Sequence, residues 1–295
     1  MRPILPMDSG KPLMYETHMH TPLCRHAFGL PEEYAEVAAQ RGLRGVIVTC
    51  HNPMPLPYSP EVRMRQHEFD EYIDMVQAAA EKTAGSVEVR LGLECDYFPG
   101  YEAWLERQLS SAEFHYVLGS VHTHVAEYQA RFWKGDVLEY QRAYFDQLAA
   151  AAETRLFDCL SHPDLVKNEI PSEWNPEALL DDIRKALDRI AAVGTALELN
   201  TSGVYKIIAE MNPFRGMLIE MRARDIPVVI GSDAHEPQRV ADHFFDAIDL
   251  LEECGYENAS YFIGRSRREI PLEDARRSLR PRLRPRKLMP QRGGS

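Results

Sequence analysis

Short apolar runs rich in β-branched residues alternate along the chain with longer stretches of helical periodicity. Residues 45–49 have the composition of a buried parallel strand, and residues 176–193 start with proline and are followed by glycine, as many helices are. We therefore predict strands at residues 14–20, 45–49, 87–93, 116–121, 157–161, 196–199 and 227–230, with a short last strand at 261–263. Helices are predicted at residues 31–41, 59–83, 101–109, 137–154, 176–193, 213–224 and 237–254.

Strict alternation of seven strands with seven helices predicts an α/β fold with a parallel sheet. Polar residues follow nearly every predicted strand at its C-terminal end. In an open sheet, ligands gather at a single switch point, whereas the rim of a closed barrel collects residues from every strand. We therefore expect a TIM-barrel-like domain over residues 1–279. Residues 280–295 alternate arginine with proline and carry six bases and no acids, so we expect a disordered basic tail.

The bulk properties of the chain exclude several classes of protein. The formal net charge of −11 disfavours non-specific nucleic-acid binding. No apolar run reaches membrane-spanning length, and residues 1–10 lack the apolar core of a signal peptide. Five scattered cysteines without a CxxC motif argue against a disulfide framework. We therefore expect a cytoplasmic protein without a membrane partner. An acidic protein that binds an anionic substrate needs a local source of positive charge, and we expect bound metal ions to provide it.

Histidine and carboxylate side chains with the chemistry of metal ligands gather at the ends of the predicted strands. Asp233 and His235 are two residues apart, as are His18 and His20, and residues so spaced on a strand point to the same side. The full set has nine members: His18, His20, His26, His51, Glu94, His122, His162, Asp233 and His235. Nine ligands exceed the need of one or two ions and suit three if a carboxylate is shared. We expect two to three divalent transition ions (Zn, Fe or Mn), bridged by Glu94 or Asp233.

The motifs that carry these ligands resemble those of the PHP (polymerase and histidinol phosphatase) superfamily. The similar segments are residues 18–21 with His26, then 49–52, 92–94, 120–122, 162–164 and 231–235. Residues 198–203 and 165–167 are similar to the histidinol-phosphatase branch. This resemblance spans residues 14–270 and implies a distorted (β/α)7 barrel with a trinuclear phosphoesterase site.

The resemblance also implies how the ligands divide among the ions. One ion would be held by His18, His20, Glu94 and Asp233, a second by Glu94, His122 and His162, and a third by His26, His51 and His235. Cys50 stands where many members have aspartate, which concerns the surroundings of His51 and not the ligand itself. Lys167 stands where several histidinol phosphatases have arginine.

The resemblance implies hydrolysis of a phosphomonoester, L-histidinol phosphate, by a hydroxide that bridges two metal ions. Asp233 and His235 are the expected catalytic residues, with Asp233 orienting the nucleophile. The candidate phosphate-binding residues are Arg25, Lys167, Lys206 and Arg239. A carboxylate should take the cationic amine of this substrate, and the candidates in loops after strand ends are Glu169, Glu210 and Glu236.

Two other functions are compatible with the same motifs. The first is a PHP phosphatase or exonuclease acting on nucleotides or oligonucleotides, which the acidic body and the absence of a basic, aromatic-lined groove in the sequence disfavour. The second is a non-catalytic PHP module of a larger replication assembly, which would tolerate the loss of ligands, whereas all nine positions are filled here. The sequence carries no signal for the oligomeric state.

Overall fold

The computed structural model describes residues 13–281 and contains one nine-stranded sheet whose strands lie in chain order. Strands β1 to β7 are each parallel to the next one, and β9 is antiparallel to β8. The strands are β1 (Tyr15–Glu16), β2 (Gly45–Val48), β3 (Glu88–Asp96), β4 (Tyr116–Ser120), β5 (Cys159–Leu160), β6 (Ala196–Asn200), β7 (Val228–Gly231), β8 (Asn258–Ile263) and β9 (Ser266–Pro271).

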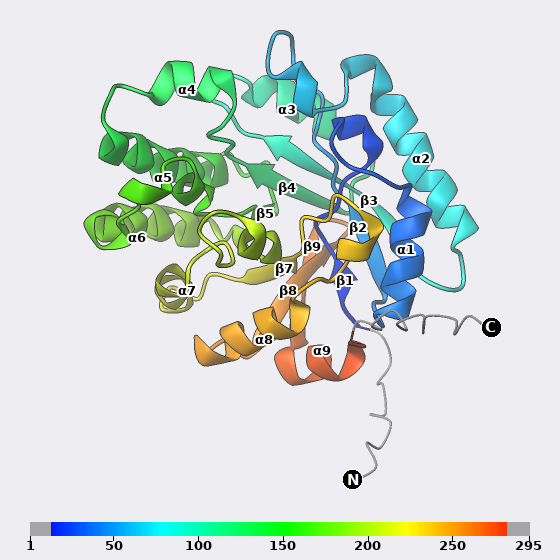
Figure 1. Cartoon of the computed structure of the whole chain (residues 1–295). Helices are drawn as coiled ribbons and strands as arrows, with labels where there is room; N and C mark the ends of the chain where they lie inside the picture. Colours follow the sequence, from blue (N-terminus) through cyan, green and yellow to red (C-terminus); the bar gives the residue numbers. More distant parts are fainter. Residues whose placement is uncertain (1–12, 282–295) are drawn as a thin grey trace, which may run out of the picture.

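The helices surround the strands, as expected when each parallel strand is followed by a helical crossover (Figure 1). They are α1 (Pro31–Gln40), α2 (Phe69–Lys82), α3 (Glu102–Leu109), α4 (Ala126–Phe132), α5 (Val137–Glu153), α6 (Pro176–Val193), α7 (Arg215–Arg222), α8 (Phe244–Glu253) and α9 (Leu272–Ser278). Helix α6 has the predicted bounds because its ends are marked locally: Asn175 accepts a hydrogen bond from the Ala178 amide, and Gly194 ends the helix at a φ of 77°.

The first strand meets the seventh beyond their C-terminal ends, which curls the sheet into a distorted barrel. The His20 amide donates to the Ala234 carbonyl at 2.9 Å, and the Ala234 amide donates to the His18 carbonyl at 3.0 Å. Toward the N-terminal ends of the strands, inward-facing apolar side chains fill the interior of the barrel. They are Tyr15, Ile47, Tyr116, Leu118, Cys159, Ala196, Val229 and Phe262. The distorted α/β barrel expected from the sequence is therefore the observed fold.

Several predicted element bounds were wrong. The helix predicted at 59–83 begins only at Phe69, after two 3-10 turns, because Arg63 is drawn inward between them by buried hydrogen bonds. The helix predicted at 237–254 is a 3-10 turn followed by α8, and the residue before α8, His243, has a φ of 58°. Strand β1 is shorter than predicted, and β3 extends through Glu94 to Asp96. Helices α4 and α9 and strand β9 were missed.

Most of the predicted tail, residues 282–295, lies outside the described part of the chain. Among the residues that are described, no helix is long and apolar enough to cross a membrane.

Candidate metal centre

All nine predicted ligand residues come together at the C-terminal ends of the strands. His18 and His20 follow β1, His51 follows β2, and Glu94 lies within β3. His122, His162 and the pair Asp233 and His235 follow β4, β5 and β7, and His26 belongs to the loop after His20. Seven of them line a cavity of about 350 Å3, and His18 and His20 are fully buried behind its wall.

Glu94 lies between groups of histidines, and its two carboxylate oxygens face different ones. Oε2 is 3.6 Å from His18 Nε2 and 3.6 Å from His20 Nε2, and it is 2.7 Å from His51 Nδ1. Oε1 is 3.6 Å from His122 Nε2 and 3.4 Å from His162 Nε2. The side chain is fully buried. This is the placement that a carboxylate bridging two cations requires.

Asp233 completes the first group, and its Oδ1 also lies 3.5 Å from Nδ1 of His235, which belongs to the third group. Its Oδ1 is 3.1 Å from His20 Nε2 and 3.5 Å from His18 Nε2, and its Oδ2 accepts a hydrogen bond from Ser202 Oγ at 3.0 Å. Asp233 has a φ of 51°, in the left-handed region that non-glycine residues adopt at a cost of about 1–3 kcal/mol. The third group, His26, His51 and His235, has its ligand atoms within 4.8 Å of one another.

The donor atoms of these residues fit bound cations. His18 Nε2 and His235 Nε2 are buried and have no hydrogen-bond partner among the described residues, and His51 Nδ1 faces Glu94 Oε2 at 2.7 Å. Buried polar atoms are nearly always hydrogen-bonded in proteins, so a cluster of unsatisfied lone pairs indicates a missing partner. Imidazole and carboxylate donors suit zinc, iron or manganese.

Oxygen atoms behind the site orient most of the imidazoles. His18 Nδ1 is 2.7 Å from Glu198 Oε1, and His122 Nδ1 is 3.0 Å from Asp96 Oδ1. His26 Nδ1 and His235 Nδ1 lie 2.8 Å and 3.0 Å from main-chain carbonyls. Such contacts fix the tautomer that leaves the other ring nitrogen free to bind metal.

Asp96 and Glu198 contact candidate ligands from behind the site, and the sequence predicted no role for either. Asp96 is two residues beyond Glu94 on the same strand, so the spacing rule that linked Asp233 to His235 would have identified it. Glu198 is fully buried and also accepts the His162 amide at 2.9 Å. A Cβ at residue 231 would lie 2.2 Å from Glu198 Oε1, which explains the glycine there.

The buried carboxyls are held ionised by their neighbours. Burial alone would raise the pKa of Glu94, but His51 and His18 outweigh it and hold that pKa well below its usual range. Burial likewise opposes ionisation of Asp96, and the nearby Arg63 and His122 lower its pKa instead. The site therefore presents anionic carboxylates to any bound cation.

A model of the PHP domain matches residues 16–202 of the chain, well over half of it. The chain belongs to the PHP domain family. A protein of Deinococcus radiodurans named probable histidinol-phosphatase is 38% identical over 256 residues, which cover 83% of this chain and 95% of that protein. The histidinol-phosphatase of Bacillus subtilis is 26% identical over 267 residues, which cover 80% and 98%.

A solved structure shares the fold of this PHP domain. It is the histidinol phosphate phosphatase of Lactococcus lactis in complex with zinc, L-histidinol and phosphate, with a TM-score of 0.72 at 19% identity. The match covers 86% of this chain and 98% of that one.

The four candidate phosphate-binding residues of this PHP domain lie in different places. Lys206 lines the cavity, and it also lines an adjoining hollow together with Arg239. Arg239 is stacked on Tyr205, 3.7 Å from the ring centroid, and its Nε is 3.1 Å from Asp242 Oδ2. Arg25 is paired with Glu68 and is absent from the cavity wall.

The prediction for Lys167 needs correction, because this side chain is fully buried and does not line the cavity. Its Nζ donates to Asp164 Oδ2 at 3.0 Å, to Glu210 Oε1 at 3.2 Å and to the Met211 carbonyl at 2.9 Å. An ammonium group has three donors, and all three are used. Lys167 therefore holds together the loops after β5 and β6.

The three candidates for the substrate amine are also separated. Glu169 lines the cavity, and its Oε1 accepts from Thr123 Oγ1 at 2.8 Å. Glu210 is paired with Lys167, and Glu236 lines the adjoining hollow beside Arg239.

Proposed function

We propose that the chain is a metal-dependent phosphomonoesterase that hydrolyses L-histidinol phosphate to L-histidinol and phosphate. The observation that carries this proposal is the set of nine histidine and carboxylate side chains around one cavity, with Glu94 between two of the groups. The names of the relatives from Deinococcus radiodurans and Bacillus subtilis, and the bound histidinol and phosphate of the Lactococcus lactis structure, support the choice of substrate.

Two to three divalent ions would be held as the family resemblance implies. His18, His20, Glu94 and Asp233 would hold the first, Glu94, His122 and His162 the second, and His26, His51 and His235 the third. Such ions supply Lewis-acid polarisation of a phosphoryl group and make water a stronger acid.

The protein's own side chains would orient the reactants. Asp233 is in the cavity wall, where its carboxylate would accept a hydrogen bond from the attacking water and aim it at phosphorus. His235 lies beside it in the same wall. Lys206 is the cation best placed to donate to the phosphoryl oxygens, because it lines both the cavity and the hollow next to it. Arg239 would approach from that hollow.

Glu169 is our choice for the contact with the substrate amine. It lines the metal cavity, whereas Glu210 is paired with Lys167 and Glu236 lies beside a competing arginine. The hydrogen bond from Thr123 leaves the second carboxylate oxygen free for an ammonium group. Truncating one partner of a buried charge pair costs about 2–5 kcal/mol.

The test is kcat/KM, measured by phosphate release, for histidinol phosphate, AMP and p-nitrophenyl phosphate. We expect histidinol phosphate to be preferred, and Glu169→Gln to reduce that preference while changing p-nitrophenyl phosphate hydrolysis little. Glu236→Gln is the matched control and should leave the preference intact. A preference for AMP would overturn the substrate assignment in favour of a nucleotide phosphatase.

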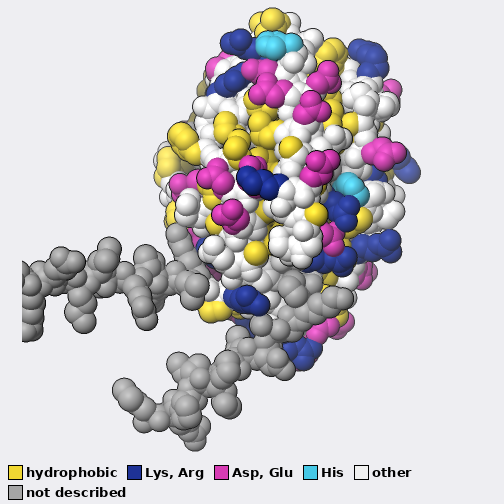
Figure 2. Space-filling model, turned by 90° about the vertical axis from the view of Figure 1, so that its right-hand side faces the viewer, with side chains coloured by type: hydrophobic (Ala, Val, Ile, Leu, Met, Phe, Trp, Pro, Cys, Tyr) yellow, Lys and Arg dark blue, Asp and Glu magenta, His cyan; other side chains and the backbone are white. Residues whose placement is uncertain are grey.

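We propose a cytoplasmic enzyme that does not act on nucleic acid. The five cysteines are all buried free thiols, which supports a reducing compartment. On the face that carries α1 and α2, acidic and basic side chains are interspersed, without a continuous basic stripe (Figure 2). A polynucleotide needs such a stripe along its backbone, and this face does not provide one.

A further inference from the structure

The turn after β6 carries a serine whose hydroxyl group faces one of the candidate metal ligands. Asn200 is the last residue of β6, and Ser202 belongs to the 3-10 turn Thr201–Tyr205. Ser202 lines the hollow that adjoins the metal cavity. Its Oγ is 3.0 Å from Asp233 Oδ2 and 2.7 Å from Asn200 Oδ1. The hydroxyl group therefore lies between a candidate ligand carboxylate and the end of a barrel strand.

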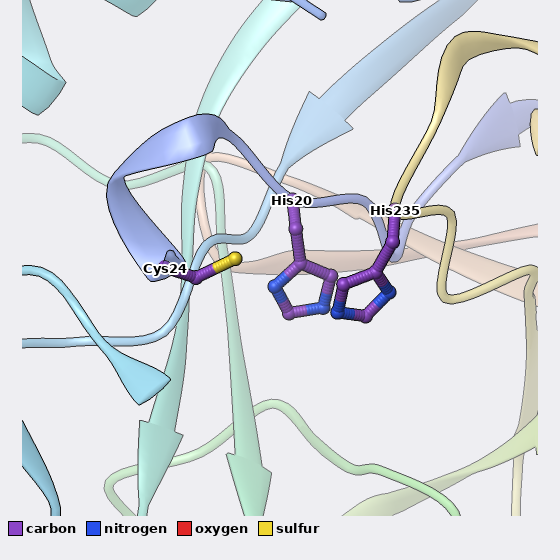
Figure 3. A group of neighbouring side chains, drawn as sticks. All are labelled: His20, Cys24 and His235. Atoms are coloured by element: carbon purple, nitrogen blue, oxygen red, sulfur yellow. The ribbon is translucent and has the colours of Figure 1, made fainter. Parts of the chain in front are cut away.

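The two carboxylate oxygens of Asp233 have different surroundings. Oδ1 lies 3.1 Å from His20 Nε2 and 3.5 Å from His235 Nδ1. Figure 3 shows these two imidazole rings face to face, and their centroids are 4.0 Å apart. Oδ2 faces the other way, toward Ser202 Oγ and, at 3.5 Å, toward Asn200 Nδ2. Oδ1 is therefore the oxygen directed at the metal centre.

The orientation of the Asp233 carboxylate is not fixed by its own side-chain torsions. The torsion that rotates a carboxylate about its bond to Cβ has broad minima, so neighbouring groups decide which way each oxygen points. The left-handed main chain of Asp233, at a φ of 51°, likewise persists only where the surroundings hold it. The bond from Ser202 comes from a residue 31 positions away, on a different strand end. It can therefore hold the carboxylate independently of the loop that carries it.

The turn that carries Ser202 is held on both sides. Asn200 Nδ2 donates to Glu198 Oε2 at 3.0 Å, and Asn200 Oδ1 accepts the Ser202 main-chain amide at 3.0 Å. Thr201 Oγ1 donates to the main-chain carbonyl of Asp242 at 2.7 Å. The position of the Ser202 hydroxyl is therefore set by the main chain and not by a mobile loop.

The hydroxyl group of Ser202 has one proton and two oxygen neighbours that can accept it. Asn200 Oδ1 already accepts the Ser202 amide proton. A hydrogen bond to an ionised carboxylate is about twice as strong as one to a neutral amide oxygen. The proton is therefore expected on the side of Asp233.

We propose that Ser202 is a positioning residue of the metal centre. Its hydroxyl donates to Asp233 Oδ2 and so holds the carboxylate with Oδ1 directed at the ion of the first group. Asn200 places this hydroxyl through the turn. The inference rests on the metal centre of the proposed function, but not on the identity of the substrate.

Metal binding by variants tests the proposal without reference to activity. We expect Ser202→Ala to weaken the binding of one zinc ion about 10–100-fold, measured by competition with a chromophoric chelator, because loss of such a supporting bond has effects of this size. Ser202→Thr keeps the hydroxyl and should recover most of the affinity.

Thr201→Val is the matched control, because it removes the neighbouring hydroxyl, which bonds to a main-chain carbonyl and not to Asp233. It should lower the melting temperature and leave zinc binding unchanged. Zinc binding by Ser202→Ala that equals the wild type would overturn the proposal. So would equal weakening by Ser202→Ala and Thr201→Val, since the effect would then come from a loosened turn.

A second measurement uses the unaltered protein and so does not depend on variants that fold. Neutron diffraction from crystals exchanged into heavy water locates the deuterium of the Ser202 hydroxyl. The proposal requires it between Ser202 Oγ and Asp233 Oδ2; deuterium directed at Asn200 Oδ1 would contradict it. Failure to hydrolyse histidinol phosphate, with the zinc and neutron results as expected, would instead count against the proposed substrate.

Discussion

Arg63 and Asp96 form a buried ion pair next to the metal centre, with Arg63 Nη2 2.6 Å from Asp96 Oδ2. The other oxygen of Asp96 is the one that orients His122. Arg63 also donates to the main-chain carbonyls of Asn52 and Ser59, so one guanidinium holds the loop after β2 against the end of β3.

The first prediction concerns the stability that this pair provides. Arg63→Met leaves Asp96 buried without its partner, and removal of one member of a buried pair costs about 3–5 kcal/mol. Urea unfolding at a fixed metal concentration should show this loss. Arg184→Met removes an exposed pair with Glu220 and should cost less than about 1 kcal/mol. Equal losses from the two variants would refute the role given to Arg63.

The second prediction concerns metal content. Glu94→Ala removes the carboxylate that faces two groups of histidines and should lose more than one ion per chain. His122→Ala removes a ligand from a single group and should lose about one. Elemental analysis after desalting distinguishes the two outcomes. At most one metal ion per chain in the unaltered protein would exclude the trinuclear arrangement.

The third prediction concerns two lysines, Lys167 and Lys206, that were both candidate phosphate-binding residues in the sequence. Lys206→Met should lower kcat/KM about 10–100-fold, the size of a lost charged hydrogen bond, and leave the melting temperature unchanged. Lys167→Met should lower the melting temperature markedly, because it leaves Asp164 without its buried partner. Full activity of Lys206→Met would contradict the phosphate contact of Lys206 and would favour Arg239 as the phosphate-binding residue.

The fourth prediction concerns acid stability at the far end of the barrel. Partial burial would raise the pKa of Glu88, but hydrogen bonds from Arg90, Tyr15 and Arg44 outweigh it and lower the pKa to about 2. The unfolded chain therefore takes up this proton first, so the stabilisation present above about pH 4.5 is lost as the pH falls toward 2. The stability difference between wild type and Glu88→Gln should shrink from pH 6 to pH 3; a constant difference would contradict this.

The fold and the gathering of the nine candidate ligands at one rim could be predicted because their signals are local. Parallel strands bring their C-terminal ends to one rim, so a polar residue after a strand can be placed without knowledge of its neighbours. The bounds of α6 followed from its first proline and the glycine after it in the same way. The number of strand-end histidines then identified the kind of site.

The rest depends on partners that are distant in the sequence. Lys167 looked like a phosphate ligand because it follows a ligand strand, but its partner Glu210 is 43 residues away. Arg63 pairs with a residue 33 positions away, and because of that pairing the helix predicted at 59–83 begins only at Phe69. Local periodicity contains no information about such contacts.

The most direct test of metal-dependent hydrolysis by this protein is to measure the release of phosphate from histidinol phosphate before and after removal of metal. We expect turnover by the purified protein, loss of that turnover after dialysis against a chelator, and recovery when zinc, manganese or iron is returned. The metal-reconstituted Glu94→Ala variant should stay inactive. Full activity of the chelator-treated protein, or none after reconstitution of the unaltered chain, would contradict it.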